Sequence, residues 1–351
     1  MPTESADALL LVSFGGPNGP DDVIPFLENV LRGRNVPRER MLEVAEHYQK
    51  FGGVSPINEQ NQALIAAIKE QFHAEGMDVP VYWGNRNWHP LLPDTLAQMK
   101  ADGIERALAF FTSMYSCYSG CRQYRENIAA AQQAVGEGAP RVDKLRMAFN
   151  HPAYIEASIA RVQDALATLP ASSRDQATFL FTAHSIPQSM ADHCNYTLQL
   201  QETCRLIMEG VGPHAWELVF QSRSGPPSQP WLEPDVCDRI ESLHQAQPIP
   251  GLVIMPVGFV SDHMEVLYDL DVEAAEVCQQ LNIPMARAKS VGTHPSFVKM
   301  ITELYRERIG TAPKRAIGQY PANWDVCPAD CCTYTPARRP TAPDADPSAA
   351  S

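Results

Sequence analysis

The stretch "ATFLFTAHS", residues 177 to 185, is an apolar run in which hydrophobic residues follow one another almost without alternation. A strand with one face in water alternates apolar and polar residues, so a continuous run predicts a strand that is buried on both faces. Such strands are typical of parallel sheets that helices cover on both sides. This stretch therefore predicts an α/β fold.

Similar runs recur on either side of this stretch. They occupy residues 8–14, 79–84, 106–112, 215–222 and 251–259. Amphipathic segments that predict helices lie between them, such as 58–76, which ends at a Gly, and 151–170, which ends at a Pro. Each half of the chain thus has its own series of strands and helices, which predicts two doubly wound halves with parallel sheets.

We place the boundary between the halves near residue 150, which gives an N-terminal half of 1–150 and a C-terminal half of 151–322. A cysteine-rich segment follows at 323–334. The last segment, 335–351, is rich in Pro, Ala and Asp without an apolar period, so we expect it to be disordered.

Composition and charge exclude several classes of function. The chain has 351 residues, of which 44% are apolar and 20% are charged, as in a globular protein. Its formal charge of −13 disfavours nucleic acid and anionic membranes as partners. The N-terminus lacks the basic leader of a signal peptide, and its apolar run is too short to span a membrane, so we expect a cytoplasmic protein without stable membrane insertion.

Two strand ends carry the candidate catalytic residues. His184 stands where the run 177–185 opens into a loop, and Glu265 follows the run 251–259 at the start of a predicted helix. If both strands belong to one sheet, the two side chains emerge at the same edge and face each other. A neutral imidazole and a carboxylate bind a divalent metal, and the same pair relays protons near neutral pH.

Six segments together resemble the ferrochelatase family, most closely the bacterial, actinobacterial-type coproporphyrin III enzymes. The segments are "LLLVSFGGP", "HYQKFGGVSPINEQ", "YSGCRQYRENI", "FTAHSIP", "FQSRSGPPSQPWLEPD" and "PVGFVSDHMEVLYDLDVEA". The resemblance implies a lyase of heme biosynthesis that inserts ferrous iron into a porphyrin, releases two protons and uses no nucleotide. It also implies two Rossmann-like halves of the chelatase type with the porphyrin cleft between them.

The resemblance implies roles for individual residues. His184 contacts iron or takes a pyrrole proton, and Glu265 is its carboxylate partner. Ser55 and Tyr124 take porphyrin-propionate positions, and Arg32 lies in the matching basic stretch, together with Arg34.

The sequence leaves the roles of the residues near Glu265 open. His263 is expected beside the catalytic pair. Asp269 and Asp271 either lead protons or metal towards the site or form a solvated helix face.

The chain departs from the family pattern in two places. Many coproporphyrin-type enzymes have a tyrosine after the first strand that ligates the iron of the product, whereas this chain has Phe14, which cannot be a ligand. Several relatives have an Arg-Tyr pair before the paired glycines, whereas this chain has His47 and Tyr48.

Alternative functions remain open at this point. One is a protoporphyrin IX ferrochelatase, and another is a carrier that binds tetrapyrrole or metal without catalysis. A chelatase for another first-row metal is a third, because His and Glu suit several such ions. We expect porphyrin and ferrous iron as the partners, and we favour a monomer.

Three of the nine cysteines, Cys327, Cys331 and Cys332, lie within six residues. An odd number of cysteines in a long intracellular chain disfavours a disulfide framework, which leaves reduced thiols, a zinc site or an iron–sulfur cluster. The resemblance favours a [2Fe–2S] cluster, because several ferrochelatases hold one with a C-terminal cysteine group and a distant cysteine. We predict Cys121 as the fourth ligand, with Cys117 as the alternative.

Overall fold

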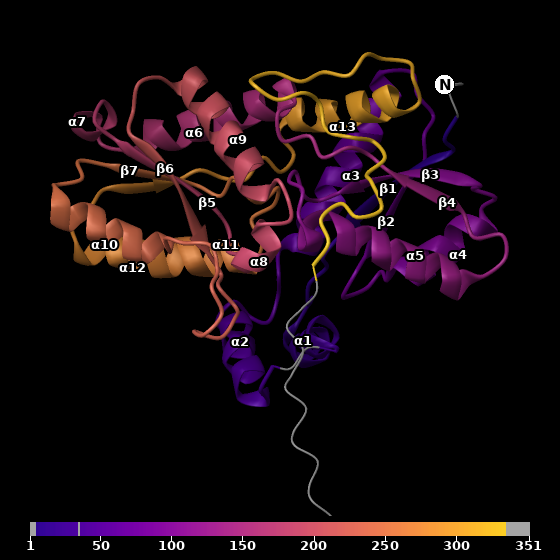
Figure 1. The fold of residues 1–351 in the computed structure, drawn as a ribbon, viewed down its shortest axis with the longest axis horizontal. Helices are drawn as coiled ribbons and strands as arrows, with labels where there is room; N and C mark the ends of the chain where they lie inside the picture. The colour runs from indigo at the N-terminus through magenta and orange to yellow at the C-terminus, as the bar shows by residue number, and fades with distance from the viewer. Residues whose placement is uncertain (1–4, 34–35, 335–351) are drawn as a thin grey trace, which may run out of the picture.

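The computed structural model describes residues 5–33 and 36–334, and within them the chain forms two four-stranded parallel sheets (Figure 1). The first sheet has the strand order β2-β1-β3-β4 and the second has β6-β5-β7-β8. The strands of the first sheet are β1 (Ala8–Ser13), β2 (Val81–Asn85), β3 (Arg106–Phe111) and β4 (Arg141–Lys144). Those of the second sheet are β5 (Thr178–His184), β6 (Trp216–Gln221), β7 (Leu252–Met255) and β8 (Met285–Arg287).

The predicted α/β fold with two parallel-sheet halves is confirmed, and each of the six apolar runs overlaps a strand. The two sheets also share one topology. Counted along the chain, the second strand of each half lies at one edge of its sheet and the fourth strand lies at the other edge. The predicted helices at 58–76 and 151–170 correspond to α3 (Ile57–Ala74) and α6 (Pro152–Thr168). The predicted tail at 335–351 lies outside the described residues.

Helices cover both faces of each sheet, as the continuous apolar strands require. The longer ones include α4 (Leu92–Ala101), α5 (Gln123–Val135), α9 (Tyr196–Val211), α10 (Val236–Ala246) and α13 (Pro295–Arg308). Shorter helical segments are η1 (Pro20–Asp22), η2 (Tyr118–Arg122), α7 (Ala171–Arg174), α8 (Gln188–Ala191), α11 (Met264–Val266), the π-helix η3 (Leu267–Ala274) and α12 (Ala275–Gln280).

One apolar core runs through both halves. Successive side chains of a strand point to opposite faces, so Leu9 and Leu11 of β1 join a cluster with α3, while Leu10 joins a separate cluster with α4 and α5. The first of these clusters continues into the second half, where it includes Phe179 and Phe181 of β5. The two halves are therefore packed against each other by shared hydrophobic burial.

Two segments extend from this double-layered body. Helices α1 (Val23–Leu31) and α2 (Arg38–Lys50) project from it together (Figure 1) and have a small core of their own around Phe26. The C-terminal chain leaves α13 and returns along the first half, where the Lys144 ammonium donates to the Trp324 carbonyl at 2.8 Å. The last described residues are thus held against the half in which the chain began.

No helix within residues 5–33 and 36–334 combines the length and the apolar character needed to cross a membrane.

Candidate active site

His184 is the last residue of β5, and its environment leaves one ring nitrogen open. Its Nδ1–H donates to the Ser185 carbonyl, which can only accept. In the neutral imidazole the proton therefore sits on Nδ1 and the lone pair sits on Nε2. The Tyr196 hydroxyl donates to the His184 carbonyl at 3.1 Å, which holds the strand end from the other side.

Glu265 lies in α11 directly opposite that nitrogen. Its Oε1 is 3.9 Å from Nε2 of His184, within range of an ion pair but too far for a direct hydrogen bond. The side chains are 31% and 48% exposed, so both are accessible to a ligand from outside. The fold thus places the strand-end histidine opposite this carboxylate, as predicted.

Several hydrogen bonds hold the loop before Glu265 in place. The Gly258 N–H donates to the Thr182 carbonyl at 3.0 Å, and a Cβ at Gly258 would lie 2.7 Å from Cα of Ala183, so only glycine permits this approach to β5. The Asp262 carboxylate accepts from Arg287 and from the Ser290 N–H, both at 3.0 Å.

The first half of the chain also holds this loop. The Gln60 side chain on α3 accepts from the Asp262 N–H and donates to the Asp262 carbonyl, both at 2.9 Å. The hydroxyl of Tyr115, also in the first half, donates to the Val257 carbonyl at 3.1 Å, and that of Tyr154 in the second half donates to the same carbonyl at 3.0 Å. The position of Glu265 therefore depends on both halves.

Further acidic residues continue from Glu265 along η3. Burial raises the pKa of Asp269 to about 7, and the charges of Glu265 and Glu273 act in the same direction, while the Ser222 and Gln221 hydrogen bonds oppose the shift. The Ser222 hydroxyl donates to Asp269 from a left-handed residue with φ of 60°. A carboxyl group with a pKa near neutrality is suited to accept and release protons.

Gln221 links this acid to the catalytic pair. Its Nε2 donates to the Glu265 carbonyl at 3.3 Å and to the Asp269 carboxylate at 3.2 Å. Asp271 behaves differently, because it pairs with Arg287 at 3.0 Å and belongs to a surface ion pair. Of the two aspartates in the sequence analysis, Asp269 alone is linked to the site in this way. Glu273 lies eight residues after Glu265 in the same acidic series and was not predicted, because no motif marks it.

His263 lies beside the catalytic pair. Its ring packs edge-on against Phe259, with 4.7 Å between ring centres. Burial lowers the pKa of His263, the His184 charge lowers it further, and the Glu265 charge opposes the shift. His263 is thus close enough to both members of the pair to respond to their charges.

Helix α2 of the first half faces this region. Burial raises the pKa of Tyr48, and the charge of Glu265 raises it further, so the phenol is near the carboxylate. The His47 ring stacks on Tyr268 of η3, with 3.9 Å between ring centres and 12° between ring planes. His47 therefore contacts the second half, and Tyr48 lies near its Glu265.

The predicted porphyrin-contacting residues lie on the first half. Ser55 is 4% exposed and Tyr124 is 5% exposed. The Arg86 guanidinium lies 4.5 Å from the centre of the Tyr124 ring and 5.7 Å from that of Phe14. Arg32 ends α1 and donates to Asn29. Arg34 lies outside the described residues, and sequence reasoning missed Arg86 because no motif marks it.

The cysteine-rich segment lies beside Cys121. The Cys121 and Cys327 thiols are hydrogen-bonded to each other, Cys327 also contacts Cys331, and Sγ of Cys331 is 3.4 Å from Sγ of Cys332. The Cys121 hydrogen bond lowers the pKa of the Cys327 thiol to about 5, with help from Lys144.

Cys117 has a different local role. Its sulfur accepts from the Gly120 N–H at 3.1 Å and caps η2. Among residues 5–33 and 36–334, no three His, Cys, Asp or Glu side chains are placed together to hold a metal ion.

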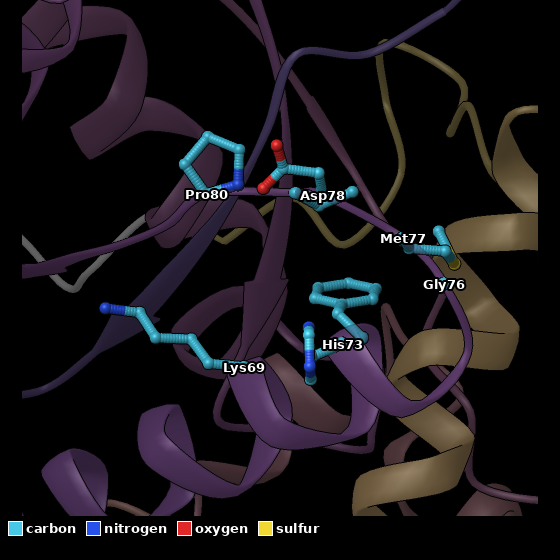
Figure 2. Close-up of a pocket in the computed structure, with 8 residues that line it drawn as sticks. Lys69, His73, Gly76, Met77, Asp78 and Pro80 are labelled. Carbon is cyan, nitrogen blue, oxygen red and sulfur yellow. The ribbon is translucent and has the colours of Figure 1, made fainter.

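A pocket of about 460 Å³ at the end of α3 is separate from all of these groups. Figure 2 shows its lining residues, which include Lys69, His73 and Asp78. It contains neither His184 nor Glu265.

Comparison with solved structures defines the class of the fold. The structure described as "SirB from Bacillus subtilis with Fe3+" matches with a TM-score of 0.54 over 87% of this chain and 96% of that chain, at 13% identity. The protein is therefore an α/β protein of the two-domain chelatase fold.

Sequence comparison defines the family. The ferrochelatase family model matches residues 6–309. A relative named "Ferrochelatase" from Rhodopirellula baltica is 63% identical over 96% of this chain and 96% of its own length. A relative named "Coproporphyrin III ferrochelatase" from Streptomyces coelicolor is 50% identical over 97% of this chain and 96% of its own length. The chain belongs to the ferrochelatase family, as the six sequence segments indicated.

Proposed function

We propose that this protein inserts ferrous iron into coproporphyrin III and releases two pyrrole protons. The observation that carries the proposal is the pair of His184 and Glu265, with an open ring nitrogen 3.9 Å from a carboxylate oxygen at the accessible edge of the second sheet. Metalation of a porphyrin requires a base and a metal-delivering group near the macrocycle face, and this pair supplies both kinds of group.

The side chains suggest how protons leave the macrocycle. The lone pair on Nε2 of His184 accepts a pyrrole proton, and the Glu265 carboxylate stabilises the imidazolium that forms. Asp269, with its pKa raised by burial to about 7, is the next acceptor along η3. Ferrous iron is a substrate here, and His184 and Glu265 are the residues we assign to its delivery.

The choice of coproporphyrin III rests on relatives and on the donors available to propionates. Curated relatives of that name are 45–51% identical to this chain. Coproporphyrin III carries four propionates, and hydroxyls and guanidinium groups bind carboxylates well. Ser55, Tyr124 and Arg32 are the residues we assign to them.

The test is anaerobic steady-state insertion of ferrous iron with coproporphyrin III and protoporphyrin IX side by side. We expect turnover with both and a higher kcat/KM with coproporphyrin III. A higher kcat/KM with protoporphyrin IX would overturn the substrate assignment. Stoichiometric binding without turnover would overturn the enzyme assignment in favour of a carrier.

We also propose that Cys121, Cys327, Cys331 and Cys332 bind a [2Fe–2S] cluster. Such clusters take four cysteine thiolates, and these four thiols interact pairwise, Cys121 with Cys327, Cys327 with Cys331 and Cys331 with Cys332. Each iron of such a cluster takes two of the four thiolates, whereas a structural zinc ion takes all four around one point. Cys117 already caps η2, which favours Cys121 as the fourth ligand. The cluster would tie the chain end to the first half.

The cluster is tested by purifying the protein anaerobically and measuring iron, acid-labile sulfide and the visible spectrum. Colour lost in Cys121→Ser and kept in Cys117→Ser is the expected result, and the reverse would exchange the ligand. A wild-type protein that is colourless or contains zinc and is fully stable and active would refute the cluster.

A further inference from the structure

Two consecutive carbonyl groups orient the His184 ring. The ring donates from Nδ1 to the Ser185 carbonyl, and the His184 carbonyl accepts from the Tyr196 hydroxyl at 3.1 Å. Because the peptide group after His184 is planar, a rotation of that plane would displace the Ser185 carbonyl and the ring bonded to it. The Tyr196 hydroxyl therefore fixes the backbone at the point where β5 ends.

Tyr196 is enclosed by the protein. It is the first residue of α9 and is 6% exposed. Its ring packs edge-on against the ring of Tyr115, with 6.2 Å between ring centres. Burial raises the pKa of the Tyr196 phenol well above its ordinary value, so the hydroxyl keeps its proton at neutral pH and remains a donor. The Tyr196 side chain thus acts on His184 through the backbone.

The first turn of α9 is bonded to the first half of the chain. The Gln199 side chain accepts from the Ser116 N–H at 2.7 Å and donates to the Ser116 hydroxyl at 3.2 Å. The same hydroxyl accepts from the Asn323 side chain at 2.8 Å. Gln199 is 2% exposed and Ser116 is 8% exposed, so little water competes for these bonds. The loop after β3 therefore fixes the helix turn that carries Tyr196.

The same loop also contacts the segment that leads to Glu265. The Tyr115 hydroxyl donates to the Val257 carbonyl at 3.1 Å. Two adjacent residues, Tyr115 and Ser116, thus contact both the helix that holds His184 and the loop that carries Glu265. The two catalytic side chains follow different strands of the second sheet, and this loop of the first half is a common reference for both.

We propose that Tyr196 is a positioning residue that holds the His184 ring opposite Glu265, and that Tyr115 and Ser116 set the place of Tyr196. This inference rests on the insertion reaction proposed above and names residues that prepare its geometry. A displacement of about 1 Å in a reacting group costs a factor of about 100 in rate. A hydroxyl that fixes the strand end therefore contributes to kcat.

The test is anaerobic insertion of ferrous iron into coproporphyrin III by Tyr196→Phe, with kcat and KM measured separately. The variant keeps the ring and loses the bond to His184, so kcat should fall roughly three- to tenfold while KM stays within about twofold. Tyr305→Phe is the matched control, because Tyr305 is also buried and donates to a backbone carbonyl, that of Ala6, at 2.7 Å. This control should lose similar resistance to urea and keep its kcat.

A double-mutant cycle separates positioning from a general loosening of the fold. If Tyr196 keeps His184 opposite Glu265, its effect depends on the Glu265 charge, so Tyr196→Phe should lower kcat less in a Glu265→Gln background than in wild type. Gln199→Met breaks both bonds to Ser116 and should also lower kcat at unchanged KM.

Each outcome decides a different point. An unchanged kcat in Tyr196→Phe, an equal fall in Tyr305→Phe, or additive effects with Glu265→Gln would overturn the inference while the insertion reaction stands. Wild-type protein without turnover on coproporphyrin III or protoporphyrin IX would refute the proposed function, and this inference with it. If Tyr196→Phe does not fold, a fall in kcat of Gln199→Met at unchanged KM supports the inference, and an unchanged kcat overturns it.

Discussion

Replacement of Glu265 by Gln removes the charge that faces His184 and nearly preserves side-chain volume. Two unit charges 3.9 Å apart attract by about 1 kcal/mol in water and by about 4 kcal/mol at an effective dielectric constant of about 20. Because the two side chains are 31% and 48% exposed, solvent screens the pair and the lower part of this range applies. We therefore expect the variant to lose about 1–2 kcal/mol of stabilisation of the imidazolium that forms when His184 takes a proton.

Such a loss corresponds to a fall of roughly 5- to 30-fold in kcat, since each 1.36 kcal/mol is about a factor of ten. The assay is anaerobic insertion at saturating porphyrin and iron, with porphyrin affinity measured separately by fluorescence. Glu276→Gln is the matched control, because it makes the same change at an exposed carboxylate of the neighbouring helix α12. An unchanged kcat with a raised KM would refute the reasoning and assign Glu265 to binding alone.

Three further perturbations test the site. His184→Ala should abolish insertion while circular dichroism and porphyrin binding persist, and near wild-type turnover would contradict the assignment. Burial raises the pKa of Asp269 to about 7 from a usual value near 4, so between about pH 4 and 7 the folded state holds a proton that the unfolded chain has lost, and the free energy of unfolding falls as pH rises. Asp269→Asn should remove this fall, on the order of 1–3 kcal/mol, in melting experiments at pH 5 and 7.5; parallel pH profiles of the two proteins would contradict it. Gln60→Ala should cost about 1–3 kcal/mol in urea unfolding by breaking both bonds to Asp262, whereas Gln71→Ala on the same helix should cost less because it loses a single bond, to Glu75 just after the helix.

Predictions from the sequence were correct where one continuous segment contains all the residues on which the prediction depends. The run 177–185 predicts both a buried strand and the exit of His184 at its end, because continuous apolar residues and a polar terminus lie within nine positions. Strands β4 and β8 were missed because they lack such an apolar run. Each has only three or four residues, with polar positions that an edge strand tolerates, so no apolar run marks them.

Features that depend on the meeting of distant segments were not predictable in this way. The bonds of Gln60 to Asp262 join residues about two hundred positions apart. The proximity of Tyr48 to Glu265 likewise depends on how α2 projects from the first half. A glutamine and a tyrosine on amphipathic helices have no sequence pattern that distinguishes these roles from ordinary surface positions.

The hydrogen bond from Nδ1 of His184 to Ser185 has a consequence for the timing of a catalytic cycle. With that nitrogen occupied, the ring offers one lone pair, and a proton and a metal ion cannot share it. If His184 serves both, each proton has to leave Nε2 before another proton or a metal ion can bind there, so these steps occur one after another. A divalent ion that stays bound to Nε2 would block every later step at this atom. Tight-binding metals should therefore act as inhibitors whose effect grows with their residence time.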